Sequence, residues 1–218
     1  GRPAVASRES EAHDAGRFVE RASSGALDLR GNFAPARQLG ALARALRGLP
    51  GLTELNLGSN GVDDAALAPL CRALSSAPAA HTLCSLDLSD AAVGPDGAAA
   101  LAALLVPEDG AHAALPRLSS LSELRLRGNK AVGDRGVQSL CAALGCNRRL
   151  AVLDVAGCGV SGEGGARALG ALLQNCASLR ELDASWSRFS PRGAALLAEG
   201  LRYNTALTSL SLSRSGLG

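Results

Sequence analysis

One phrase of regularly spaced leucines recurs along the chain and constrains its fold more than any other feature. The phrase Leu-x-x-Leu-x-Leu-x-x-Asn-x-Val is complete at residues 52–62, and its middle leucine returns at positions 27, 55, 86, 124, 153, 182 and 210. Repeats of about 30 residues form supersecondary units that bury their apolar faces only against neighbouring units. The sequence therefore predicts a solenoid of about seven stacked repeats.

One position of each repeat, which we call the slot, follows the third leucine by three residues. It holds small, mostly polar residues: Asn32, Asn60, Ala91, Asn129, Cys158, Ser187 and Ser215. With Asn or Cys in the slot, the repeat pattern resembles that of the ribonuclease-inhibitor-like subfamily of leucine-rich repeats. The resemblance covers about nine tenths of the chain. The resemblance implies an α/β leucine-rich-repeat solenoid, a curved horseshoe with a parallel β-sheet on its concave face and helices on its convex face. In that family the slot side chain hydrogen-bonds neighbouring turns, so alanine and serine predict looser or differently satisfied turns.

The chain is predicted to have two parts. Residues 1–22 predict the helix of a preceding or capping unit, and residues 23–218 hold about seven leucine-rich repeats, the last incomplete. Because the chain begins without Met and stops within a phrase, we expect a piece of a longer array with open ends. Residues 106–116 form an insertion that is either a binding loop or a tolerated surface loop.

The same repeats also predict where strands and helices begin. Short parallel strands are expected to start near Ala26, Glu54, Ser85, Glu123, Val152, Glu181 and Ser209. Helix starts are indicated by proline at the first helical position in Ala34-Pro35, Gly94-Pro95 and Ser190-Pro191. Asp63 and Ser161 are expected to cap two further helices.

Composition predicts a folded, cytoplasmic protein without a nucleic-acid or membrane partner. Hydrophobic residues make up 47% of the chain, charged residues 19% and aromatic residues 2%, with a net charge of +2. A nucleic-acid surface needs a basic stripe, usually with stacking aromatics, and the aromatic residues here are scattered. No apolar run approaches the ~20 residues of a membrane span, and the first residues given do not show the charged-then-apolar pattern of a signal peptide.

The six cysteines are interpreted as buried small residues of a reduced protein. Cys71 and Cys141 share one helical register, and Cys158 fills a slot. Cys146 and Cys176 leave helices at equivalent places, so a disulfide or metal-binding pair is the alternative. No C-x-x-C pair is present and the histidines are isolated, so we predict no metal.

One motif mimics a cofactor site. Residues 157–162 match the dinucleotide fingerprint G-x-G-x-x-G, with Asp183 about 20 residues further on. Equivalent glycines recur at residues 58–61 and 128–133, which favours a role in the repeat turn. We therefore predict no cofactor and no enzymatic activity.

The strand side chains that alternate with the buried leucines define the informative surface. Seven acidic residues and three arginines occupy three columns of this face, which gives it a net charge of −4 and leaves +6 elsewhere. Like charges on adjacent strands, as in Asp154 beside Asp183, destabilise a sheet. The functional interpretation is a docking surface for a basic protein partner, and the alternative is a ladder in which Arg125 neutralises Asp87 and Asp154. The candidate protein-binding residues are Glu54, Asp87, Glu123, Asp154, Glu181, Asp183 and Trp186.

Trp186, the single tryptophan, has two interpretations. It is an exposed anchor at the rim of the face, as tryptophans at interface hot spots are. Alternatively, it folds down to fill the space left where Ala184 replaces the third leucine of the phrase.

The predicted function is a non-catalytic interaction module or scaffold within a larger cytoskeletal, ciliary or signalling assembly. The resemblance also implies two alternatives, a GTPase activator of the nuclear-transport type and a sensor domain of an innate-immune receptor. An activator needs an acidic tail and a basic rim residue, for which Arg127 and Lys130 are candidates. A sensor needs an upstream nucleotide-binding domain.

Overall fold

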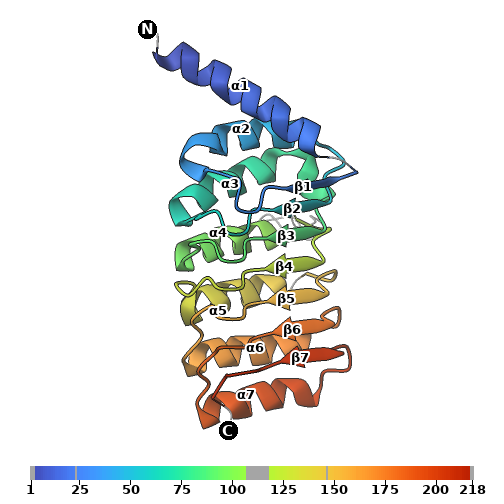
Figure 1. The fold of residues 1–218 in the computed structure, drawn as a ribbon. Coiled ribbons are helices and arrows are strands. Elements are labelled where there is room, and N and C mark those ends of the chain that lie inside the picture. The colour runs from blue at the N-terminus through green and yellow to red at the C-terminus, as the bar shows by residue number, and fades with distance from the viewer. Residues whose placement is uncertain (1–2, 23, 107–117, 146, 217–218) are drawn as a thin grey trace.

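A computed structural model describes residues 3–22, 24–106, 118–145 and 147–216. Within these ranges, strands and helices alternate along the chain, with one short 3-10 helix (Figure 1). The strands are β1 (Ala26–Asp28), β2 (Glu54–Asn56), β3 (Ser85–Asp87), β4 (Glu123–Arg125), β5 (Val152–Asp154), β6 (Glu181–Asp183) and β7 (Ser209–Ser211). The helices are α1 (Pro3–Arg21), α2 (Pro35–Arg47), α3 (Asp64–Ser76), η1 (Pro78–His81), α4 (Pro95–Leu105), α5 (Gly133–Leu144), α6 (Glu163–Asn175) and α7 (Pro191–Arg202).

All strands of the described residues form one parallel sheet in sequence order, from β1 to β7. Each middle leucine pairs with the middle leucine of the next repeat, beginning with Leu27 opposite Leu55. The strands start at the predicted residues, so the predicted solenoid architecture is confirmed. Figure 1 shows helices α2–α7 stacked behind one side of the sheet, with the other side of the sheet open.

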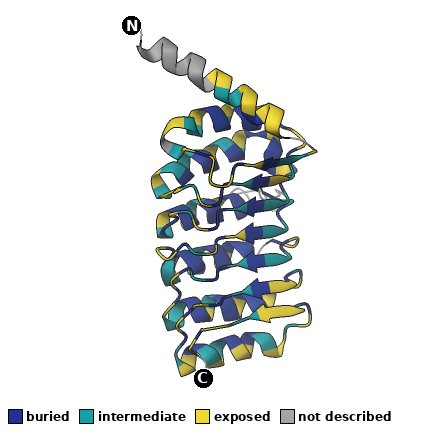
Figure 2. Cartoon of the chain, in the orientation of Figure 1, coloured by how far each residue is buried: buried dark blue, intermediate teal, exposed yellow. Residues whose placement is uncertain are grey.

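The core lies between the sheet and the helices and is almost wholly aliphatic. Leu55, Leu86 and Leu124 are each 1% exposed, and each strand before β7 is buried at its middle residue and more accessible on both sides (Figure 2). Burying one leucine stabilises a protein by roughly 1.5–3 kcal/mol relative to leaving it exposed. The regular leucine phrase is therefore what holds each strand to the helix behind it.

The slot side chains connect neighbouring turns. The buried Asn129 side chain donates hydrogen bonds to the carbonyls of Leu88 and Leu126 at 2.8 and 2.7 Å. Cys158 replaces it in the next repeat and donates through Sγ to Leu126 O. Ser187 and Ser215 both donate to Ala184 O, so these turns are satisfied differently, as predicted.

The predicted helix starts hold with one exception. Prolines open α2, α4 and α7, and the side chains of Asp63 and Ser190 accept capping bonds from backbone amides. The prediction that Ser161 caps a helix is wrong, because α6 begins at Glu163 after Gly162. The backbone amide of Ser161 instead donates to Asp134 Oδ1, which lies one repeat earlier.

Helix α1 packs on α2 beside the first repeat. Phe18 of α1 is 3% exposed and lies 6.2 Å from the ring of Phe33, measured between centroids. The insertion predicted at residues 106–116 lies outside the described residues from 107 onward, as does Cys146 of the proposed cysteine pair. Within the described part of the chain, no helix is long and apolar enough to cross a membrane.

Candidate functional site

The open side of the sheet, which we call the sheet face, is formed by the first and third residues of β1–β7. Each strand before β7 has a buried middle residue flanked by two more accessible ones. Glu54 and Glu181 are exposed, whereas Asp87, Glu123, Asp154 and Asp183 are half-buried. The sheet face therefore presents the predicted acidic side chains to solvent.

Five side chains at the third strand position share one structural task. Each accepts a hydrogen bond from the backbone amide two residues further on, at 2.8–3.0 Å: Asp28, Asn56, Asp87, Asp154 and Asp183. Short polar side chains commonly satisfy backbone amides in this way. Because Asn56 forms the same bond without a charge, the bond alone does not require the carboxylates of the other four residues.

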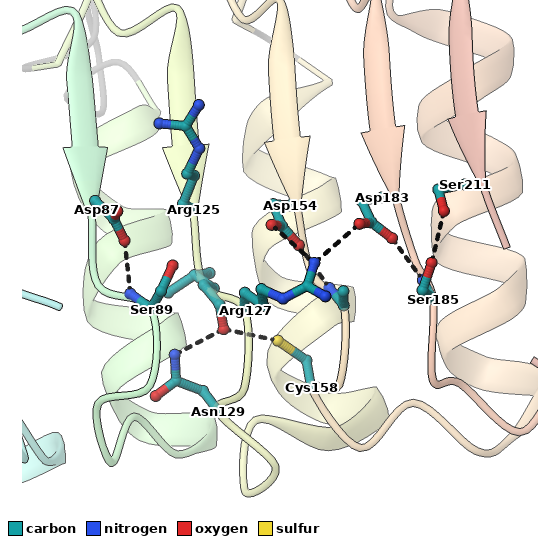
Figure 3. A network of polar contacts seen from close by, with 12 residues as sticks. Asp87, Ser89, Arg125, Arg127, Asn129, Asp154, Cys158, Asp183, Ser185 and Ser211 are labelled. Carbon is teal, nitrogen blue, oxygen red and sulfur yellow. Dashed lines mark hydrogen bonds and ion pairs between the residues drawn. The ribbon is translucent and has the colours of Figure 1, made fainter. Parts of the chain in front are cut away.

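Arg127 lies between the two adjacent carboxylates that the sequence analysis singled out. Its Nη1 is 3.1 Å from Asp183 Oδ2 and 3.7 Å from Asp154 Oδ2 (Figure 3). Arg125, expected to form the ladder, instead pairs with Glu123 on its own strand and points away from this network. A charge ladder exists, but a different arginine forms it, so much of the repulsion between Asp154 and Asp183 is offset.

The electrostatic environment of Asp154 remains unfavourable for a charged group. Burial raises the pKa of Asp154 above its usual value, and the neighbouring Asp183 raises it further. The amide of Ala156 and the guanidinium groups of Arg127 and Arg125 lower it only in part. The negative charge of Asp154 therefore lowers the stability of the folded state, so folding alone does not explain a charged residue at this position.

The carboxylates at the other end of the sheet face surround a shallow hollow of about 130 Å³. Asp28, Glu54 and Asp87 line it, and Arg125 is the cation among its described lining residues. The candidate residues chosen from the sequence did not include Asp28. Asp28 occupies the same third strand position as Asp87, and this equivalence could have identified Asp28 as a candidate from the sequence.

Trp186 lies apart from this hollow, in a groove beyond the ends of the strands. It is 52% exposed, and the guanidinium of Arg214 is 4.4 Å from the centre of its ring. Because half of Trp186 is exposed, its ring does not fold into the core to fill the space of the missing leucine. The groove also contains Arg127 and Lys130, so the structure groups Trp186 with cations, not with the acids of the sheet face.

The glycines that match the dinucleotide fingerprint form the turn after β5. Gly157 and Gly159 adopt positive φ angles of 66° and 73°. The amide of Gly157 donates to Ser185 O, one rung of a ladder between neighbouring turns. No cluster of three or more His, Cys, Asp or Glu side chains that could hold a metal ion occurs among the described residues.

Comparison with known families agrees with this geometry. A sequence model of the leucine-rich repeat matches residues 50–71, 79–102 and 117–141. The chain contains leucine-rich repeats. The three matches follow the repeat units around β2, β3 and β4.

Two solved structures resemble this chain at low identity. The tropomodulin C-terminal domain of Caenorhabditis elegans is 12% identical, with a TM-score of 0.49, and the match covers 88% of this chain and 93% of that one. Actin-binding site 2 of leiomodin-1 is 14% identical, with a TM-score of 0.41, and the match covers 87% of this chain and 88% of that one. The leucine-rich repeats are assigned from the matched sequence and from the parallel sheet.

Proposed function

We propose that this chain is a non-catalytic interaction module that docks a basic segment of another protein on its sheet face. The single observation that carries the proposal is the hollow where Asp28, Glu54 and Asp87 meet with Arg125 as the cation beside them. The docking surface extends from this hollow along the sheet to Glu123, Asp154, Glu181 and Asp183.

The charges of the molecule support a basic partner. The three columns defined from the sequence carry a net charge of −4 while the rest of the chain carries +6, and this difference favours a basic partner on the sheet face. Complementary charges mainly accelerate association and exclude wrong partners. The asparagine at position 56 indicates that the neighbouring carboxylates supply charge beyond what the turns need.

We place this module in the cytoplasm, within a cytoskeletal, ciliary or signalling assembly. The described cysteines, Cys71, Cys84, Cys141, Cys158 and Cys176, are all free thiols. Free thiols persist in reducing compartments, where disulfides are rare. The free cysteines therefore favour a cytoplasmic protein.

Affinity capture with a matched pair of variants tests the proposal. The face variant combines Asp28→Asn, Glu54→Gln and Asp87→Asn, which removes charge but keeps amide oxygens for the backbone bonds. The control combines Asp14→Asn, Glu20→Gln and Glu199→Gln, which removes the same charge from α1 and α7. Basic proteins retained by the wild type and the control should be lost from the face variant. Equal retention by all three would place the interface elsewhere.

A further inference from the structure

A second hollow, which we call the groove, lies in the turns that follow β3–β7. It has a volume of about 780 Å³. Its floor is the turn after β5, where residues 156–159 read Ala-Gly-Cys-Gly and carry no large side chain. The neighbouring turns carry Lys130 on one side and Trp186 and Arg188 on the other. The groove therefore forms where a turn with small side chains lies between two turns with large side chains.

Two bulky residues of the groove, Trp186 and Arg214, have a backbone conformation that disfavours large side chains. The residue before each slot is left-handed in all seven repeats, with φ between 51° and 80°: Gly31, Ser59, Asp90, Gly128, Gly157, Trp186 and Arg214. Glycine adopts such angles without strain, whereas bulky residues do so at a cost in energy. The two bulkiest side chains at this position, Trp186 and Arg214, stand side by side at the groove, and strained residues of this kind cluster at ligand sites.

The groove has the opposite charge from the sheet face. Arg127, Lys130, Arg188 and Arg214 line it, with Asp90 as the acid among its described lining residues. Arg127 is engaged by Asp154 and Asp183, and Arg214 stacks on Trp186. Lys130, Arg188 and Arg214 are exposed, so their charges face solvent.

We propose that the groove binds an acidic peptide segment that places an apolar side chain against Trp186. Carboxylates of the segment pair with Lys130, Arg188 and Arg214, and the glycine floor admits the peptide backbone. This site takes a ligand of the opposite charge from that of the docking surface on the sheet face, and the two sites meet at Arg127, which lines the groove and pairs with Asp154 and Asp183.

The geometry favours a peptide over a phosphate group or a nucleic acid. Backbone amides that would cradle a phosphate are already used, since Gly128, Gly157 and Trp186 donate to carbonyls of the next turn. The volume suits several amino-acid residues and exceeds that of a single phosphate. Strand-binding grooves stack successive bases on several aromatic rings, and Trp186 is the aromatic among the described residues that line this groove.

Because Trp186 is the single tryptophan of the chain, its fluorescence reports directly on the groove. The test titrates the protein with a blocked pentapeptide of four glutamates around a central leucine, and with a matched lysine peptide. The acidic peptide should shift the emission to shorter wavelength in a saturable, salt-sensitive manner, while the lysine peptide should not. Calorimetry supplies a second measure of affinity.

Variants locate the binding. Lys130→Ala and Arg188→Ala should each weaken it roughly two- to fivefold, as expected for single exposed ion pairs. Arg167→Ala, an exposed arginine on α6, should leave it unchanged. Circular dichroism verifies that each variant is folded. A carbodiimide should join a peptide carboxylate to Lys130, the single lysine of the chain, as mapped by mass spectrometry.

Several results would overturn the proposal. Inorganic phosphate competing as well as the peptide would indicate a simple anion site, and tighter binding of an oligothymidylate would indicate a nucleic-acid site. Self-association lost on Arg188→Glu would mean that a second copy occupies the groove. An equal effect of Arg167→Ala, or the absence of binding by calorimetry, would show that the groove has no such ligand.

Discussion

At the scale of single residues, most side chains at the third strand position both accept a backbone hydrogen bond and carry a negative charge. Five of these side chains accept hydrogen bonds from backbone amides, which explains why Asp or Asn recurs at this position. The leucine phrase predicts where these residues stand. It does not predict that Arg127, one repeat before Asp154 and two before Asp183, reaches both carboxylates, because that contact depends on side-chain conformation.

Two substitutions at Asp154 separate the charge from the hydrogen bond. Asp154→Asn keeps an acceptor for the amide of Ala156, whereas Asp154→Ala leaves this amide without its partner. We expect Asp154→Ala to lower the free energy of unfolding by about 1–2 kcal/mol. Asp154→Asn should raise it at neutral pH, because burial makes the charged form unfavourable. Urea denaturation measures both changes.

The pH dependence of this difference follows from the raised pKa of Asp154. The folded protein binds this proton more tightly than the unfolded chain does, so the wild type loses stability as the pH rises above about 3.8, the ordinary value. The advantage of Asp154→Asn should therefore grow with rising pH and vanish in acid. An advantage that is constant across this range would contradict the burial of the charge.

At the scale of elements, neighbouring helices pack through glycine. A Cβ atom at Gly200 in α7 would collide with the backbone of Gly170 in α6, whereas one at Gly164 would meet only the end of the Gln138 side chain. Sequence alone shows glycines in both helices but not which of them lies against another backbone. That distinction depends on how the two helices are oriented in the stack.

The two glycines should respond oppositely to alanine. Alanine is favoured over glycine inside a helix by about 1 kcal/mol, so Gly164→Ala should stabilise the protein by up to that amount. Gly200→Ala should destabilise it by about 1–3 kcal/mol, because the helices must move apart. Thermal unfolding of the two variants compares them directly, and equal effects would contradict the close approach of α6 and α7.

At the scale of the whole molecule, the repeat period was enough to predict the sheet, its strand order and the burial of the middle leucines of β1–β6, whereas Leu210 of β7 is 37% exposed. Each repeat contacts mainly its neighbours, so local spacing determines the architecture. The two hollows were not predictable in this way. The groove depends on small residues at 156–159 lying between large ones in adjacent repeats, and the hollow of the sheet face depends on how Arg125 turns.

The buried thiols should report unfolding of the whole array. Burial raises the pKa of Cys71, Cys141 and Cys158 to about 12, so these thiols stay protonated and unreactive in the folded protein. Alkylation at neutral pH should modify them only after denaturation, as measured by peptide mass spectrometry. Their contribution to stability is complete below pH 9.0, the ordinary thiol value, and is lost as the pH rises toward 12.

The most direct test of the docking surface is the amide NMR spectrum of the labelled protein during titration with a blocked tetralysine peptide. The amides of Arg30, Gly58 and Ser89 donate to the side chains of Asp28, Asn56 and Asp87, so they report on the hollow of the sheet face. We predict that these signals shift in the wild type and stay still in the Asp28→Asn, Glu54→Gln, Asp87→Asn variant. Shifts confined to the helices, or identical shifts in both proteins, would contradict the account.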